Sequence, residues 1–119
     1  MSPEREYTLW RLLIGIIRNT DTLLSEVEGH LLPEQHEDLS EIHAANLKLA
    51  RILNQVAKGE WEGESMIHDL RSPLNIIIGY SEILLDDKKG DLNSSQMGYL
   101  RAIYEDGLTV SNTLGEIFN

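Results

Sequence analysis

The sequence predicts an all-α protein, an antiparallel four-helix bundle made of two tandem helical hairpins. Apolar residues recur at alternating spacings of three and four in four separate segments, which is the seam expected of packed helices. No segment shows the period of two that a half-buried β-strand requires. Breaks that contain glycine or proline separate the four segments. With 119 residues, 41% of them hydrophobic, the chain is long enough to enclose a core.

We expect helices at roughly residues 4–28, 33–58, 64–88 and 94–118. The seam of the first pair consists of Leu9, Leu13, Ile16, Thr20 and Leu23, followed by Leu39, Ile42, Asn46, Leu49, Leu53 and Val56. The seam of the second pair consists of Ile67, Leu70, Leu74, Ile77, Ser81 and Leu84, followed by Leu100, Ile103, Gly107, Val110, Leu114 and Ile117. Residues 59–63 separate the pairs.

The ends of the helices also have sequence signals. Pro33 suits the first turn of the second helix, where its missing N–H costs nothing. Gly90 is expected as the C′ residue that follows the third helix. Asn93 is expected as the N-cap of the fourth helix, because Gln96 stands three residues later in the pattern of a capping box.

The two hairpins are similar to each other in sequence. At an offset of 61 residues, twelve positions between 13 and 56 are identical without a gap, including Gly29 with Gly90 and Gln35 with Gln96. Two amphipathic hairpins of equal length also share leucines by chance, but the matched glycine and glutamine favour a duplication. We therefore predict a degenerate hairpin at 1–60 and a second hairpin at 61–119, which together form one bundle within a single chain.

The composition excludes several classes of function. The formal net charge of −10 argues against a nucleic-acid partner and against the anionic surface of a membrane. The absence of cysteine excludes disulfides and thiolate metal sites. The apolar run at 12–17 is flanked by Arg11 and Arg18 and is too short to span a bilayer, and it lacks the layout of a signal peptide. A cytoplasmic protein is therefore expected.

One stretch of the third helix carries candidate chemistry. His68 is one step off the apolar seam and should lean outward, with Asp69 beside it. A neutral imidazole is a nucleophile, and a neighbouring carboxylate can hold its other N–H. Ser72 lies on nearly the same face as Asp69, and Pro73 should bend the helix because it cannot donate to the Asp69 carbonyl. On the residues alone, an exposed histidine beside an aspartate is more often part of a solvated surface, so the pair by itself is weak evidence for a site.

The stretch His68-Asp-Leu-Arg-Ser-Pro-Leu-Asn75 resembles the H-box of sensor histidine kinases, and residues 65–119 resemble their dimerisation and histidine phosphoacceptor domain. The resemblance implies that His68 is the phosphorylated residue, that Asp69 is its acid/base neighbour and that Pro73 is the kink residue. Ser72 stands where the family usually has Thr or Asn to orient a water molecule. This departure leaves phosphatase activity open.

The first hairpin departs much further from the H-box. The residues that match its histidine, acidic, arginine and proline positions are Tyr7, Thr8, Trp10 and Leu12. This half therefore has no acceptor and no acid/base neighbour. The whole chain would be a pseudo-dimer of the histidine kinase dimerisation domain, in which the first half completes the bundle around one active histidine.

Histidine kinases carry an ATP-binding domain after this hairpin, whereas this sequence contains no Gly-rich phosphate loop and no strand on which to build one. We expect no cofactor in this chain, with ATP on a separate catalytic domain and Mg²⁺ on a partner receiver. The phosphoryl group on His68 would arrive from another protein, or from a domain outside this sequence. No metal site is expected, because His36 and His43 lie about 10 Å apart along one helix.

Three functions remain open from the sequence. The first is a phosphoacceptor module that relays a phosphoryl group between a histidine kinase and the aspartate of a response-regulator receiver domain. The second is a non-enzymatic regulator that imitates the kinase dimer and binds a kinase or a receiver. The third is the excised dimerisation domain of a sensor histidine kinase, which would be a homodimer, whereas the duplicated bundle would be a monomeric pseudo-dimer.

Overall fold

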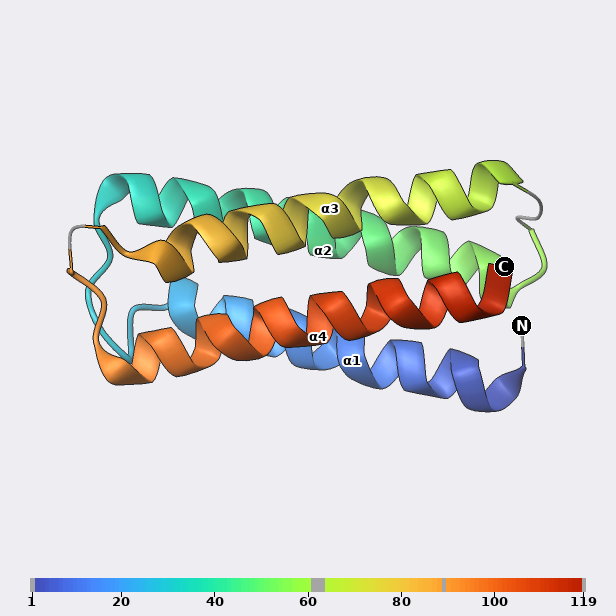
Figure 1. Ribbon diagram of the computed structural model, residues 1–119, viewed down its shortest axis with the longest axis horizontal. Helices are drawn as coiled ribbons and strands as arrows, with labels where there is room; N and C mark the ends of the chain where they lie inside the picture. Colours follow the sequence, from blue (N-terminus) through green and yellow to red (C-terminus); the bar gives the residue numbers. More distant parts are fainter. Residues whose placement is uncertain (1, 61–63, 89, 119) are drawn as a thin grey trace.

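The computed structural model describes residues 2–60, 64–88 and 90–118, which form four helices (Figure 1). These helices are α1 (Pro3–Leu24), α2 (Pro33–Ala57), α3 (Glu64–Asp86) and α4 (Ser94–Phe118). Within the described ranges there is no β-strand. The predicted fold class is confirmed, because the protein is all-α and its helices pack as one four-helix bundle.

Each helix runs antiparallel to the one before it and packs against two neighbours (Figure 1). The contacts form a ring of α1 with α2, α2 with α3, α3 with α4 and α4 with α1. Consequently α1 and α3 lie on one diagonal of the bundle, and α2 and α4 lie on the other. The rod measures 43 × 22 × 21 Å. The start of α1, the start of α3 and the end of α4 all lie at one end of it (Figure 1).

The core is a column of mainly aliphatic side chains along the predicted seam. All predicted seam positions are buried except Val56, Ile67 and Ile117, which lie near helix ends and are half-buried. At the start of α3 the prediction is wrong by one residue, because Met66 takes the buried position instead of Ile67. Burial of one Leu or Ile side chain contributes about 1.5–3 kcal/mol, so this column is the main source of stability.

Polar or small residues interrupt the core at one level in each half. In the first half the amide of Asn46 donates to Thr20 Oγ1 at 3.1 Å, which joins α2 to α1. In the second half the matching positions hold Ser81, which bonds within its own helix, and Gly107. A Cβ on Gly107 would lie 3.1 Å from Cγ1 of Ile78. The first half thus uses a hydrogen bond at this level, and the second half uses close approach of α4 to α3.

The loops inside the two hairpins follow the same course, 61 residues apart. Glu26 and Asp87 both have positive φ, 60° and 38° respectively, just after their helices. The carboxylate of each accepts the backbone N–H five residues later, from Leu31 at 2.7 Å and from Leu92 at 3.3 Å. The internal similarity therefore extends from sequence to backbone conformation.

Two helices end earlier than predicted. α1 stops at Leu24 rather than near residue 28, because the backbone enters the left-handed region at Glu26. α3 stops at Asp86 rather than near residue 88, and the positive φ beside its end belongs to Asp87. Gly90 is therefore not the C′ residue. It closes the turn instead, with a φ of 64° and an N–H that donates to the carbonyl of Asp87 at 2.8 Å.

The predicted helix starts are confirmed for α2 and α4. Asn93 accepts the N–H of Gln96 at 2.8 Å through its side chain, and the Gln96 side chain accepts the N–H of Asn93 at 2.9 Å. This reciprocal pair is a capping box. Pro33 opens α2 as predicted, and Gln35 accepts the N–H of Leu32 at 2.8 Å in the same way.

The break between the hairpins lies partly outside the described residues. Its first residue, Gly59, has a φ of 72° and donates its N–H to the carbonyl of Val56 at 3.0 Å, while Glu60 donates to the carbonyl of Gln55 at 2.9 Å. These two bonds form a Schellman motif that ends α2. None of the described helices combines the length and the apolar character that crossing a membrane would require.

Candidate functional site

The predicted site lies in the second turn of α3, at the end of the rod where α1 begins and α4 ends (Figure 1). Leu70 and Leu74 bury one face of α3, and His68 lies on the opposite face with 85% of its side chain exposed. Its Nδ1 atom lies 3.6 Å from Oδ1 of Asp69, whose side chain is 39% exposed. That distance is slightly longer than a hydrogen bond allows. The imidazole is therefore open to solvent and has a carboxylate within a small rotation of one nitrogen.

The rest of the H-box divides between surface and core. Arg71 and Ser72 are exposed, and Ser72 follows His68 by four residues, which places both on one side of α3. Pro73 is buried, and α3 continues across it as one helix. The proline removes one helical hydrogen bond, at the carbonyl of Asp69, without ending the helix. The bend expected at Pro73 stays a prediction.

The first half carries different groups at the matching place. Tyr7, 61 residues before His68, is also exposed, at 69%. The hydroxyl of Thr8 donates to a carbonyl of its own helix at 3.0 Å. Trp10 and Leu12 are half-buried and pack against the core. The bundle thus presents two equivalent exposed positions on diagonal helices, one with an imidazole and one with a phenol.

The other histidines do not gather into a site. His30 Nδ1 lies 3.3 Å from Glu26 Oε1, and His43 Nδ1 lies 3.4 Å from Asp21 Oδ1. Nδ1 of His36 lies 3.5 Å from the hydroxyl of a serine four residues later on α2. Among the residues that the structure describes, no three His, Asp or Glu side chains are arranged to hold a metal ion.

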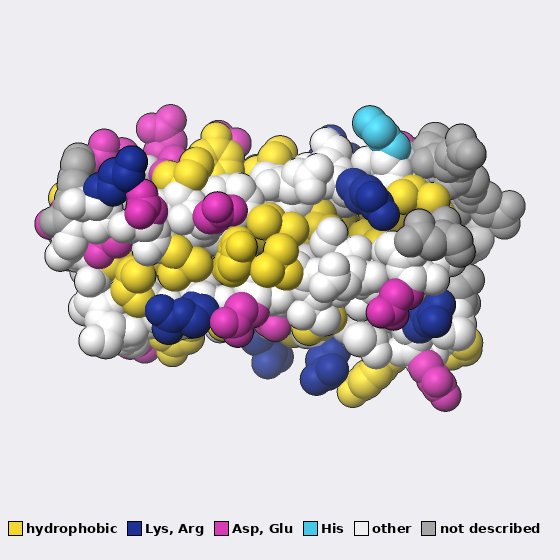
Figure 2. Space-filling view, viewed as in Figure 1, with side chains coloured by type: hydrophobic (Ala, Val, Ile, Leu, Met, Phe, Trp, Pro, Cys, Tyr) yellow, Lys and Arg dark blue, Asp and Glu magenta, His cyan; other side chains and the backbone are white. Residues whose placement is uncertain are grey.

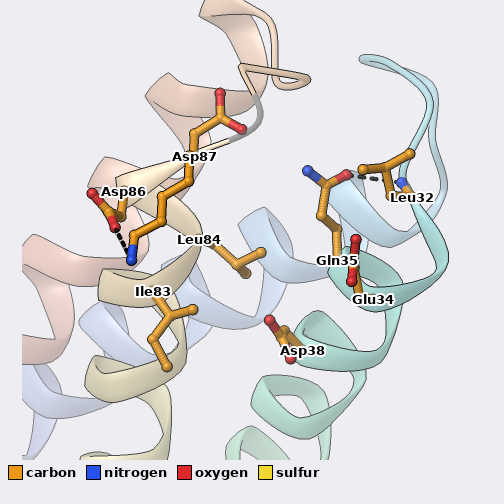
Figure 3. A pocket seen from close by; sticks show the side chains of 9 residues that line it. Leu32, Glu34, Gln35, Asp38, Ile83, Leu84, Asp86 and Asp87 are labelled. Carbon is orange, nitrogen blue, oxygen red and sulfur yellow. Dashed lines mark hydrogen bonds and ion pairs between the residues drawn. The ribbon is translucent and has the colours of Figure 1, made fainter.

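A groove that the sequence did not indicate lies at the opposite end of the rod, between the start of α2 and the end of α3 (Figure 3). Its volume is about 340 Å³, and its lining includes Leu32, Asp38, Ile83, Leu84 and Asp86. Ile83 follows His68 by fifteen residues, about 22 Å along the helix axis, so the groove does not serve the imidazole. Ile83 is also the signal that could have revealed it, as an apolar residue that falls outside the seam.

An apolar strip on the surface between α3 and α4 was likewise not predicted. Leu108 of α4 is exposed, and Ile78 of α3 lies against the neighbouring Gly107. Figure 2 shows hydrophobic side chains gathered in the middle of this face, between the two helices. Ile78 is ten residues from His68, about 15 Å along the axis. A protein that reaches the imidazole along this face would cover the strip.

Comparisons with known proteins agree with this geometry. Residues 64–119 match the family described as the His Kinase A (phospho-acceptor) domain. The chain is 31% identical over 86 residues to the aerobic respiration control sensor protein ArcB homolog of Haemophilus influenzae, covering 69% of this chain and 26% of that protein. It is 37% identical over 73 residues to the circadian input-output histidine kinase CikA of Synechococcus elongatus, covering 61% and 9%. It is 40% identical over 52 residues to the aerobic respiration control sensor protein ArcB of Escherichia coli, covering 44% and 6%. No solved structure matches the chain.

The chain spans about a quarter of the length of the first of these relatives and less than a tenth of the other two. The alignment with the Haemophilus protein covers 69% of this chain, which is a larger share than residues 64–119 make up. The alignment therefore continues into the first half. The family match begins four residues before His68 and includes all of α3 and α4, so the exposed imidazole and its carboxylate neighbour both fall inside it. Residues 64–119 therefore form a domain of the His Kinase A (phospho-acceptor) family.

Proposed function

We propose that this chain is a phosphoacceptor module of two-component signalling, in which His68 accepts or relays a phosphoryl group between a histidine kinase and the aspartate of a response-regulator receiver domain. The observation that carries the proposal is the 85% exposed imidazole inside the family match, with the Asp69 carboxylate 3.6 Å away. A macromolecular donor can reach such a ring, whereas it could not reach one enclosed among leucines. A cytoplasmic location, expected from the cysteine-free sequence, is part of the proposal.

In one direction of the relay, the donor is a receiver whose aspartate carries the phosphoryl group. Because Nδ1 of His68 faces Asp69, Nε2 is the nitrogen free to attack. Nε2 forms a bond to phosphorus while the bond between phosphorus and the aspartyl oxygen breaks, and the aspartate leaves with that electron pair. Asp69 holds the Nδ1 proton and stabilises the positive charge that develops on the ring. The reverse path returns the phosphoryl group to the receiver.

Partners supply the remaining chemistry in this proposal. Mg²⁺ belongs to the receiver domain, and ATP belongs to a separate histidine kinase catalytic domain. The apolar strip between α3 and α4 would contact the docked partner, since Leu108 and Ile78 lie on a face that is continuous with the start of α3. Apolar contact of this kind holds a partner in place while polar groups at its edge set the orientation.

The first half is proposed to be a structural pseudo-subunit, with the chain divided into hairpins at 1–60 and 61–119. The matched backbone at Glu26 and Asp87 supports this division, as does the burial of matched seam positions in both halves. Tyr7 stands at the acceptor position of the first half, so one bundle would hold one active histidine.

The test is transfer of phosphate to the purified chain from a phosphorylated receiver, or from a histidine kinase catalytic domain with ATP and Mg²⁺. Wild-type protein should acquire an acid-labile label, and His68→Gln should acquire none. His36→Gln is the matched control, because His36 is also exposed and lies on α2, and it should label like wild type. Equal labelling of His68→Gln would end the proposal.

A non-enzymatic regulator is the second candidate, and the exposed Tyr7 in place of an acceptor favours it. Such a bundle would keep the shape of a kinase dimer but would carry a phosphoacceptor histidine in only one of its two halves. Its signature would be a receiver or kinase domain that binds wild type and His68→Ala equally, with no phosphohistidine formed. The third candidate, an excised dimerisation domain, is favoured by the Haemophilus alignment that continues before residue 64, and it differs in oligomeric state.

A further inference from the structure

A groove on the outer side of α1 takes no part in the proposed phosphoryl transfer. It has a volume of about 420 Å³ and is lined by one helix alone, through Tyr7, Trp10, Arg11, Ile14, Gly15 and Arg18. We call these six residues the α1 outer face. Tyr7 is 69% exposed and Ile14 is 45% exposed, so a phenol ring and an aliphatic side chain both face solvent beside two guanidinium groups.

The α1 outer face is basic within a strongly acidic protein. The chain has a net charge of −10, yet residues 7–20 contain two arginines and no acidic residue. Arg11 and Arg18 are separated by seven residues, which places them on one side of the helix about 10.5 Å apart along its axis. The ion pairs found among the described residues involve neither guanidinium. Burial raises the pKa of the half-buried Asp106 carboxyl on the neighbouring α4 and the charge of Glu105 raises it further, whereas the charge of Arg11 lowers it.

The residue types of the α1 outer face are those that dominate protein–protein binding energies. Tyr, Trp and Arg are enriched at interface hot spots, and this chain, with 6% aromatic residues, groups Tyr7 and Trp10 with both arginines. Two cations on a chain of net charge −10 are too few to hold nucleic acid or an anionic membrane. Two guanidinium groups, those of Arg11 and Arg18, with the apolar Ile14 between them fit a segment of another protein instead.

The position of the α1 outer face follows from the internal duplication. Its residues stand 61 positions before the face of α3 that carries His68. Because α1 and α3 lie on a diagonal of the bundle, a partner bound to α1 leaves the imidazole accessible. Along the lower edge of the molecule, Figure 2 shows basic and hydrophobic side chains side by side and, farther to the right, an acidic one.

We propose that the α1 outer face binds an acidic amphipathic helix of a partner protein. Two carboxylates seven residues apart on that helix match the spacing of Arg11 and Arg18. An apolar side chain between the carboxylates covers Ile14, which lies between Arg11 and Arg18 on α1. Arginine–carboxylate pairs give such a contact its selectivity and its sensitivity to salt, while the apolar centre contributes burial. This binding goes beyond the proposed phosphoacceptor function and does not depend on His68.

The experiment measures the fluorescence anisotropy of two labelled helical peptides on the full chain. One peptide carries Glu at positions i and i+7 with Leu between them, and its twin carries Lys in place of both Glu. Wild type should bind the Glu peptide at least about tenfold more tightly than the Lys peptide. The double variant R11E/R18E should lose this preference. The matched control K48E/R51E changes the net charge equally on the exposed side of α2 and should keep it.

Each of the following three outcomes would overturn the proposal. Equal affinity of wild type for both peptides shows that the face has no preference for acidic helices. An equal loss in K48E/R51E shows that net charge alone acts, provided that circular dichroism finds both variants folded. Self-association of the chain that R11E/R18E abolishes assigns the face to a second copy instead. Phosphoryl labelling of His68 should be unchanged in R11E/R18E, so failure here is distinct from failure of the phosphoacceptor role.

Discussion

Asp38 lies on the second turn of α2, with Glu34, Glu37 and Glu41 on the same helix. Burial is the largest cause that raises the pKa of the Asp38 carboxyl, and the charges of the three glutamates raise it further. A carboxyl whose pKa is higher in the folded state than in the unfolded chain disfavours folding when it is ionised. Its stabilising contribution is fully present below the unfolded pKa and is lost as the pH rises through the folded pKa.

Asp38→Asn should therefore increase the free energy of unfolding at pH 7, because the amide is neutral in both states. The gain should vanish at about pH 3, where the carboxyl is protonated in the folded state and largely so in the unfolded chain. Urea denaturation at the two pH values measures the difference, with Glu82→Gln on the exposed side of α3 as the control. A gain of equal size at both pH values would assign the effect to packing rather than to charge.

Single residues of the core could be predicted because burial imposes a period on each helix. The error at Met66 has a physical cause, since 3.6 residues per turn drift by about 20° per heptad against a 3.5-residue seam. The outward position of His68 follows from the same period. The residues of the α1 outer face also follow a helical period, so their grouping could be predicted. Which side of α1 stays uncovered could not, because that depends on the positions of the neighbouring helices α2 and α4.

At the scale of elements, the loop between α1 and α2 and the cap of α4 behave as one unit. The side-chain amide of Asn93 donates to the carbonyl of Glu28 at 2.7 Å. A Cβ on Gly29 would lie 2.5 Å from Nδ2 of Asn93 and 2.7 Å from Nε2 of Gln96. These two side chains form the capping box, so any side chain at position 29 would displace the cap. A Cβ on Gly90, by contrast, would have no atom within 4 Å.

Gly29→Ala should therefore destabilise the protein more than Gly90→Ala. The first change combines overpacking of about 1–3 kcal/mol with loss of a helix cap worth about 1 kcal/mol. The second costs about 1–2 kcal/mol, for an alanine in the left-handed region. Gly98→Ala is the control and should stabilise α4 by about 1 kcal/mol, since its Cβ meets open space inside a helix. Thermal unfolding of the three variants ranks them, and equal costs at positions 29 and 90 would refute the coupling of loop and cap.

Element boundaries were predictable where side chains encode them. Asn93 and Gln96 specify the start of α4 by their spacing, and the structure forms the bonds that this spacing implies. The end of α1 was not predictable, because Glu26 adopts the left-handed conformation that glycine usually takes. The N–H of Leu31 donates to the Glu26 carboxylate at 2.7 Å and stabilises that turn. Such a bond depends on the path of the whole loop rather than on a local pattern.

At the scale of the whole molecule, the order of neighbours is what two hairpins related by a twofold axis would give. The first helix of each hairpin contacts the second helix of the other, as α1 with α4 and α3 with α2. The number of helices and their antiparallel order could be predicted from seams and breaks. The direction in which the ring turns could not, because bundles that turn left or right bury the same seam positions.

The chain closes its own bundle, so the 119-residue chain should be a monomer while its second half alone should not. Of the side chains that the structure describes in the second half, nine aliphatic or methionine side chains are buried: Met66, Leu70, Leu74, Ile77, Leu84, Leu100, Ile103, Val110 and Leu114. If removal of the first half costs only about 1 kcal/mol for each of them, the loss of about 9 kcal/mol equals the whole stability of a typical small domain. Residues 61–119 alone should therefore pair into a dimer with a second copy or remain unfolded.

Light scattering across a hundredfold range of concentration checks both chains, with an expected mass of 13.5 kDa for the 119-residue chain. A dimer of the 119-residue chain that dissociates on dilution would favour the excised dimerisation domain, in which two copies pair through α3 and α4. A duplicated chain can also dimerise by exchanging hairpins, but separating and repacking whole hairpins makes that exchange slow. Its dimer and monomer fractions would stay distinct after dilution. A monomer at all concentrations, together with a dimeric second half, would show that the first hairpin replaces a second copy of the phosphoacceptor hairpin.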